Sequence, residues 1–280
     1  FAKLANGTPL DFQYDTTDGV KAELEKYKDK SAFNLGSFGH EAVLEPEKWE
    51  TVVCEPKANR ASHEGLNSLI DFWEMQALFS FGPTTDMKTD AKKEYIQKLI
   101  VQSGKRSIEF KDATIVQKMH SRWMAYADGL WSSILAAAHK EVSIYCNDYN
   151  GLPMRVRPDG LLFANQIGVN AVVSVKTTSE TSVKGYARQF TRLGYDVKEA
   201  AYQRIVSQVT GLDFSTTIMI VLSTAEPFNV GVFILDDSEI RFATGRFHTA
   251  MDLAKACIQV NSFPGWEGVE EMGLVDLKVY

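Results

Sequence analysis

Two short motifs in the middle of the chain could do chemistry together. Asp159 lies in the run Arg-Pro-Asp-Gly at residues 157–160, and Lys176 ends the largely apolar run 171–176. Carboxylates are ligands that Mg²⁺ prefers, and a bound cation polarises a phosphate and lowers the pKa of water. A lysine alongside can hold the attacking water and screen the charge that builds up on the phosphate. Together the two residues suggest metal-assisted phosphodiester hydrolysis.

Each motif is weak evidence when it is taken alone. Pro-Asp is a common turn dipeptide, so a purely structural role for Asp159 is the ordinary expectation. Lys176 could be a strand-end lysine in solvent, although Val173 and Val175 indicate that its strand is buried. The combination, 17 positions apart on neighbouring predicted strands, is what favours a site.

The elements that must position these residues are strands. The pattern predicts strands over residues 141–145, 154–163 and 171–176, with a turn at 148–151. Neighbouring strands of such a meander lie side by side, so we expect Glu141, Asp159 and Lys176 to converge on one edge.

The rest of the chain predicts helices and further strands around this sheet. We expect a loosely structured start followed by helices over 62–81, 88–102 and 113–139, and later a helix marked by Val197, Ala201, Ile205 and Val209. Residues 216–222 and 230–235 predict a hairpin-like strand pair, and Ser238 is expected to cap a final helix. This order predicts an α/β fold with a mixed central sheet flanked by helices.

Composition narrows the class of protein. A chain of 280 residues with 45% hydrophobic residues can bury a large core, and no apolar run is long enough to predict a membrane span. No signal peptide is expected from residues 1–10, and three scattered cysteines suggest a reducing cytoplasm and no zinc or iron–sulfur site. The net charge of −6 means that DNA contact would need a local basic patch.

Further segments carry a resemblance to a known family. The chain resembles RecE-like exonucleases (the exonuclease VIII type), phage and prophage enzymes of the PD-(D/E)xK nuclease superfamily, from about residue 35 to 277. The matching segments follow in the family's order: LGSFGHEAVLEPE at 35–47, EVS at 141–143, RVRPDG at 155–160, VKTT at 175–178, YDVKEAAY at 195–202, and Trp266.

The resemblance implies a fold and a set of site residues. The expected fold is a restriction-endonuclease-like core in one domain, 1–280, with a mainly helical N-terminal part at 1–139 and a sheet core at 140–280. Mg²⁺, with Mn²⁺ as an alternative, would be held by four residues: Asp159, His40, Glu141 and the carbonyl of Val175. The implied catalytic residues are Lys176, Asp159 and Tyr202.

The resemblance also implies an activity and partners. The expected enzyme degrades one strand of linear duplex DNA in the 5′-to-3′ direction during phage-type homologous recombination. It would act as a homo-oligomer in the cytoplasm of a bacterial or phage-infected cell, with a single-strand annealing protein as partner and no membrane association.

Two departures from the family pattern leave alternatives open. Ser174 stands where the second metal-binding acid is expected. A carboxylate from elsewhere (Glu141, Glu180 or Glu199) could complete the site, as in some restriction enzymes of this fold. Otherwise Asp159 and His40 would work weakly alone, or the chain would be a catalytically inactive nuclease-fold protein that binds DNA or a protein partner.

The second departure is a lysine in place of a glutamine. Lys198 replaces the glutamine of the family's Gln-x-x-x-Tyr pattern. Its side chain could lie along apolar surface with the amine in solvent, point at a phosphate, or supply charge near Ser174. Arg188 and Arg192, with Lys184 and Arg204, are candidate DNA contacts or an ordinary solvated helix face.

Overall fold

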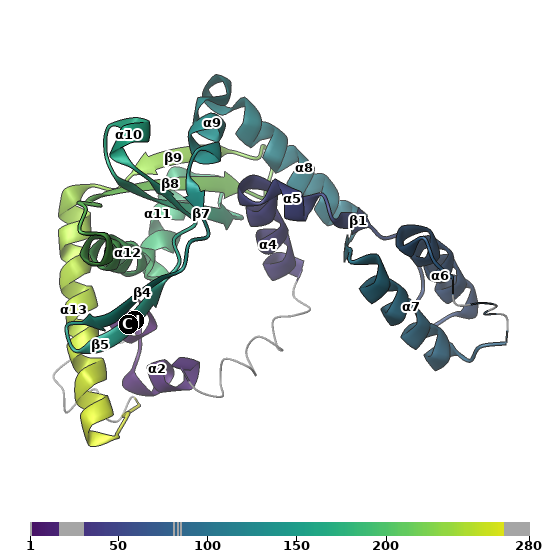
Figure 1. Cartoon of the computed structure of the whole chain (residues 1–280), viewed down its shortest axis with the longest axis horizontal. Helices are drawn as coiled ribbons and strands as arrows, with labels where there is room; N and C mark the ends of the chain where they lie inside the picture. Colours follow the sequence, from purple (N-terminus) through teal and green to yellow (C-terminus); the bar gives the residue numbers. More distant parts are fainter. Residues whose placement is uncertain (1, 17–30, 81, 83, 85, 266–280) are drawn as a thin grey trace, which may run out of the picture. The chain divides into compact units, whose positions relative to one another are not determined.

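The chain forms two compact units. The computed structural model describes all residues except 1, 17–30, 81, 83, 85 and 266–280. One unit comprises Phe1–Gly36 and Arg122–Tyr280, and the other comprises Ser37–Ser121. The elements of both are labelled in Figure 1. The interpretation of 1–280 as a single nuclease-like domain stays a prediction, and Trp266 lies outside the described residues.

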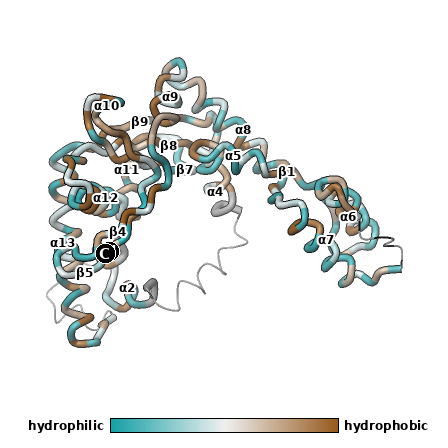
Figure 2. The backbone as a smooth tube through the Cα atoms, in the orientation of Figure 1, coloured by the Kyte–Doolittle hydropathy of each residue, from teal (hydrophilic) through white to brown (hydrophobic). Residues whose placement is uncertain are grey.

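A five-stranded sheet is the centre of the first unit. Its strand order is β3-β6-β7-β8-β9, with β7 and β8 parallel and the other neighbours antiparallel. The strands are β3 (His139–Lys140), β6 (Gly160–Leu162), β7 (Ala171–Thr178), β8 (Thr216–Ser223) and β9 (Val230–Ile234). Most residues of β7 and β8 are buried, and both strands are rich in valine, isoleucine and leucine (Figure 2). Such runs are typical of strands that are covered on both faces.

Helix α12 (Tyr195–Thr210) covers the β7 residues on which the site depends. Val172 belongs to the same buried cluster as Val197 and Ala201 of this helix. Successive side chains of a strand point to opposite faces, so Ser174 and Lys176 share the face of Val172. Helix α13 (Asp237–Val260) adds Phe247 and Met251 to this cluster.

The predicted meander is only partly correct. Residues 154–163 form two strands, because Pro158, which has no backbone N–H, interrupts them. β4 (Ile144–Tyr149) and β5 (Leu152–Val156) form a separate antiparallel pair, while β6 joins the large sheet. Glu141 precedes β4 and adopts a positive φ of 54°, so the strand predicted from that residue begins three residues later.

Shorter helices complete the first unit. They are α1 (Ala2–Asn6), α2 (Pro9–Thr16), the 3₁₀ turn η1 (Tyr126–Gly129), α9 (Leu130–Ala136), α10 (Ala164–Ile167) and α11 (Val183–Arg192). Helix α11 was not expected from the sequence. The cap of α13 is Asp236, whose side chain accepts from the Ser238 N–H, so the expected Ser238 cap is wrong by two residues.

The second unit has its own core. Helices α6 (His63–Ala77) and α7 (Thr89–Ser103) pack together through Leu66, Trp73 and Leu99, close to the predicted ranges. A parallel strand pair joins β1 (Val52–Cys54) to β2 (Arg106–Ile108). The helices α4 (Ser31–Leu44) and α5 (Pro46–Trp49) occupy a region that we expected to be loosely structured, so that expectation is wrong.

The long helix predicted over 113–139 is also broken. Helix α8 (Phe110–Ala125) is followed by η1, in which Ala127 and Asp128 have positive φ values of 49° and 54°. L-residues rarely adopt this conformation inside a helix, so the chain turns there before α9 begins.

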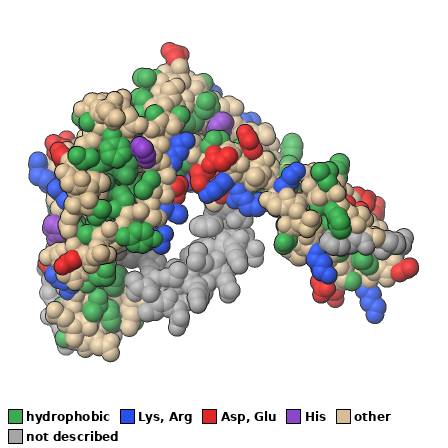
Figure 3. Space-filling view, in the orientation of Figure 1, with side chains coloured by type: hydrophobic (Ala, Val, Ile, Leu, Met, Phe, Trp, Pro, Cys, Tyr) green, Lys and Arg blue, Asp and Glu red, His purple; other side chains and the backbone are tan. Residues whose placement is uncertain are grey.

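The fold class is confirmed as mixed α/β, with a central mixed sheet flanked by helices. None of the described helices combines the length and apolarity that a membrane span requires. On the face seen in Figure 3, acidic and basic side chains are interspersed, in keeping with a modest net charge.

Candidate active site

Asp159 and Lys176 meet as the sequence predicts. Asp159 directly precedes Gly160, which pairs with Val173 in the β6–β7 ladder. Asp159 Oδ2 accepts a hydrogen bond from the Val175 N–H at 2.6 Å. The same oxygen forms an ion pair with Lys176 Nζ at 3.2 Å. Lys176 Nζ also donates to the Val175 carbonyl at 3.0 Å. The lysine therefore contacts two of the three oxygen ligands that the resemblance implies for the metal.

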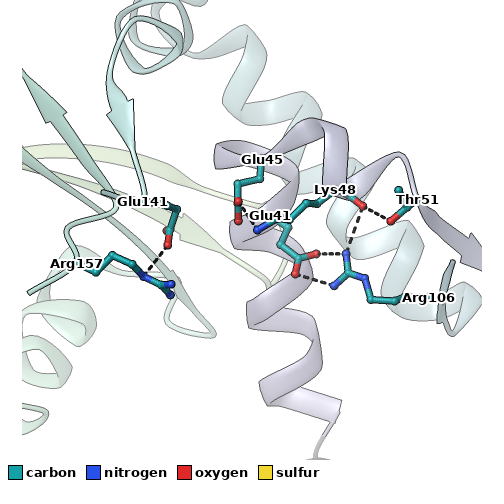
Figure 4. Close-up of polar contacts among 7 residues, drawn as sticks. All are labelled: Glu41, Glu45, Lys48, Thr51, Arg106, Glu141 and Arg157. Atoms are coloured by element: carbon teal, nitrogen blue, oxygen red, sulfur yellow. Dashed lines mark hydrogen bonds and ion pairs between the residues drawn. The ribbon is translucent and has the colours of Figure 1, made fainter. Parts of the chain in front are cut away.

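Glu141 comes to the same edge of the sheet. Its carboxylate lies within 4.8 Å of that of Asp159. Its N–H donates to the Asp159 carbonyl at 3.3 Å, and its Oε2 pairs with Arg157 Nε at 3.0 Å (Figure 4). A non-glycine residue with positive φ is strained, and here the strain accompanies a side chain turned toward a second acid.

Ser174 is bonded to a carboxylate from α12. Both Ser174 and Glu199 have exposed fractions of 0%, and Ser174 Oγ lies 2.7 Å from Glu199 Oε1. Glu199 Oε2 is buried without a hydrogen-bond partner in the described structure. Of the three acids considered for the missing position, Glu199 is therefore the one that contacts Ser174. Glu180 lies instead beside Gly185 at the start of α11, where its Oε2 would be 2.2 Å from an added Cβ.

Aromatic and basic side chains of α12 border the acids. Lys176 Nζ lies 5.7 Å from the Tyr195 ring centre, and Lys198 Nζ lies 4.9 Å from that of Tyr202. Burial raises the pKa of Tyr202, and the charges of Glu199 and Asp159 raise it further. The phenol therefore keeps its proton at neutral pH and can donate a hydrogen bond. Lys198 is half-buried over this ring, which agrees with a stem lying along other side chains.

The basic residues of α11 form a separate group. Lys184, Arg188 and Arg192 are exposed and recur every four residues, which places them on one face of the helix. Ser182 caps the helix by accepting the Gly185 N–H at 3.0 Å. Arg204 of α12 is also exposed.

His40 belongs to the other unit, where it lies in α4 and is half-buried. The next residue, Glu41, binds both terminal nitrogens of Arg106 at 2.8 and 2.7 Å (Figure 4). The metal-binding role of His40 stays a prediction.

The donor set of the first unit fits a hard divalent cation. Asp159, Glu141 and the Val175 carbonyl offer oxygen atoms, which Mg²⁺ and Mn²⁺ prefer. The unpartnered oxygen of Glu199 is a further donor, and a buried carboxylate oxygen without a partner needs an explanation.

Sequence reasoning named Glu199 only as one of three alternatives and missed Tyr195. No clear signal in the sequence marked Glu199, because Asp196 and Gln203, which share its face of α12, are polar as well.

The sheet, the Asp159–Lys176 pair and the neighbouring acids define a protein of the PD-(D/E)xK-like class. Residues 14–272 match the model of a family described as a PDDEXK-like domain of unknown function (DUF3799), and the chain belongs to this family.

Other comparisons are weaker. No curated protein matches the chain. One similar solved structure is a provisionally assigned exonuclease from Eubacterium rectale, with 12% identity, a TM-score of 0.41 and 70% of each chain covered. Another is the protein SSO0001, with 13% identity and a TM-score of 0.27, covering 80% of this chain and 88% of the other.

Proposed function

We propose that the protein is a metal-dependent nuclease that hydrolyses DNA phosphodiester bonds as an exonuclease. The observation that carries the proposal is the contact of Lys176 Nζ with both Asp159 Oδ2 and the Val175 carbonyl, in a chain of a PDDEXK-like family. An acid and a lysine at this spacing on neighbouring strands are the residues that metal-assisted phosphodiester hydrolysis needs.

Each residue has a distinct role in the proposed reaction. Asp159, Glu141 and the Val175 carbonyl would hold Mg²⁺ or Mn²⁺, which when bound polarises the phosphate and lowers the pKa of water. Lys176 positions the attacking water and offsets charge on the phosphate. The water loses a proton and forms a new P–O bond, while the bond to the leaving sugar oxygen breaks and that oxygen takes up a proton. Tyr202, which keeps its own proton, donates a hydrogen bond to a phosphate oxygen.

His40 is proposed to complete the metal site. It lies in α4, within the segment at 35–47 that carries the resemblance to RecE-like exonucleases. A neutral imidazole nitrogen is an acceptable ligand for Mn²⁺ and a weaker one for Mg²⁺.

The finer properties rest on the resemblance to RecE-like exonucleases. They are 5′-to-3′ degradation of linear duplex DNA, a role in phage-type recombination, a homo-oligomeric state, a single-strand annealing partner and a cytoplasmic location. Lys198, Arg188 and Arg192 are proposed to contact the DNA backbone, since basic side chains provide most non-specific affinity for phosphates.

A second candidate function is supported by Ser174. Without an acid at this position the site lacks one strong ligand, and the protein could bind DNA or a protein partner without cleaving it. The two functions differ in one measurable property, which is Mg²⁺-dependent loss of substrate.

The test is digestion of linear duplex DNA, labelled separately at each 5′ and 3′ end, with and without Mg²⁺. We expect release of label by the wild type with Mg²⁺, and a loss of about 100-fold or more in Lys176→Ala. Lys98→Ala is the matched control, because Lys98 is an exposed lysine of α7 in the second unit. Equal activity of wild type and Lys176→Ala, or no cleavage by the wild type, would reject the nuclease and favour the binding protein.

A further inference from the structure

The buried pair of Ser174 and Glu199 has a geometry that a structural hydrogen bond alone does not explain. Ser174 Oγ lies 2.7 Å from Glu199 Oε1, so the carboxylate of α12 stands directly above the side chain that replaces the expected acid. Ser174 and Lys176 share one face of β7, and Lys176 contacts Asp159 on that face. The carboxyl group of Glu199 is therefore in the region that a longer acidic side chain at position 174 would reach.

The second oxygen of Glu199 points to a missing ligand. Oε2 is fully buried and has no hydrogen-bond partner among the described residues. An ionised carboxylate with one unsatisfied oxygen is costly to bury, and a protonated one that shares its proton with Ser174 through Oε1 would still leave Oε2 without a partner. A divalent cation satisfies such an oxygen directly.

The charges around Glu199 agree with this reading. Burial raises the pKa of its carboxyl, while Lys176 and Lys198 lower it and Asp159 raises it. Two carboxylates near enough to repel each other, with lysines alongside, form the setting in which a bound cation is stabilising.

The other candidate acids have different partners. Glu141 is paired with Arg157 and bonded through its N–H to the Asp159 carbonyl. Glu180 lies against Gly185 of α11.

We propose that Glu199 is the second acid of the metal site, supplied from helix α12 in place of residue 174, and that Ser174 positions it through the hydrogen bond to Oε1. The proposal rests on the proposed function, because it assigns a ligand to the same metal. If it is correct, the metal site has kept its second acid at a new position and has not lost it.

The test measures Mn²⁺ binding to the metal-free protein by calorimetry, without DNA. Glu199→Gln keeps the size and the Ser174 hydrogen bond, and we expect it to weaken binding by about tenfold or more. Asp159→Asn should do the same, while the matched control Glu180→Gln should bind as the wild type does. Circular dichroism verifies that each variant is folded.

The outcomes separate the two proposals. Loss of binding in Asp159→Asn but not in Glu199→Gln would overturn the role of Glu199 and leave the metal site in place. No binding by the wild type, or equal binding in all variants, would overturn the metal site itself.

A swap of the acid provides a second, independent test. In Ser174→Asp combined with Glu199→Gln, the carboxylate returns to the strand while the number of charges stays the same. Recovery of Mn²⁺ binding relative to Glu199→Gln supports the proposal. A folded double variant that binds no better than Glu199→Gln would overturn it. So would a double variant that fails to fold, because the site would then not accept an acid at position 174.

Discussion

The buried carboxyl of Glu199 lies within reach of the charges of Lys176, Lys198 and Asp159. Asp159 is paired with Lys176 and Glu141 with Arg157, whereas among the described residues Glu199 has the Ser174 hydroxyl as its hydrogen-bond partner. Burial raises the pKa of Glu199 more than the charges of Lys176 and Lys198 lower it, so burying this carboxyl as an anion destabilises the metal-free protein. Glu199 should therefore behave as a group that costs stability until a cation binds.

This cost has a pH dependence that can be measured. Burial raises the pKa of Glu199 above its ordinary value of 4.5, so the folded protein holds a proton that the unfolded chain releases. The stability of the metal-free protein is therefore unaffected below that ordinary value, falls as the pH rises from it toward the raised pKa, and levels off above the raised pKa. Glu199→Gln removes this pH-dependent loss of stability, because glutamine does not ionise.

We expect Glu199→Gln to gain stability over the wild type as the pH increases from about 4 to about 8, as measured by urea unfolding in the presence of a chelator. Asp196→Asn serves as the control, since Asp196 is a buried acid of the same helix that is already paired with Arg246. A constant difference between wild type and Glu199→Gln across this range would contradict the raised pKa.

At the scale of single residues, the sequence predicted the contact between Asp159 and Lys176 but did not single out Glu199. Asp159 and Lys176 could be identified because the residues around each of them predict a strand. Glu199 could not, since its position depends on how α12 is rotated on β7, which no local pattern specifies. Glu180 and Glu199 are equally plausible in the sequence, and only packing separates them.

At the scale of elements, β7 and α12 make the site and α11 flanks it. The ranges of β7, β8 and β9 and of α6, α7 and α12 were predictable, because each has a sustained apolar pattern. Helix α11 was not predicted as a separate element, although Tyr186 and Phe190 recur at helical spacing opposite its basic residues, because only Tyr186 of its ten residues is buried. The division of 154–163 was hidden by apolar residues on both sides of Pro158.

The exposed basic face of α11 predicts a specific dependence on salt. Arg188→Ala removes one candidate phosphate contact without disturbing a buried residue. The change is made in a Lys176→Ala background, so that the DNA is not cleaved during the measurement. Compared with Lys176→Ala alone, we expect the double variant to bind duplex DNA of any sequence more weakly. The slope of log affinity against log salt should fall in magnitude by about 1.

The same measurement on Lys98→Ala provides the matched control, since this residue lies on α7 of the other unit. If the slope for Arg188→Ala equals that of the control, α11 does not contact the DNA backbone.

At the scale of the whole molecule, two units each have their own core. The Leu66–Leu99 cluster stabilises residues 37–121, and the Val172–Val197 cluster stabilises the sheet unit. Helix α4 carries the predicted ligand His40, while the acids come from the sheet unit. With a net charge of −6, the proposed affinity for DNA would have to come from local features such as α11. Family membership and the fold class hold for the chain as a whole.

The most direct test of the central claim is a crystal structure with Mn²⁺, read from its anomalous scattering. We expect one ion bound at about 2.1 Å by Asp159, Glu141, the Val175 carbonyl and Glu199 Oε2, with His40 proposed as a further ligand. An ion bound at Asp159 with Glu199 turned away would contradict the relocated acid. Absence of any ion at Asp159 in a Mn²⁺-saturated crystal would contradict the nuclease site as a whole.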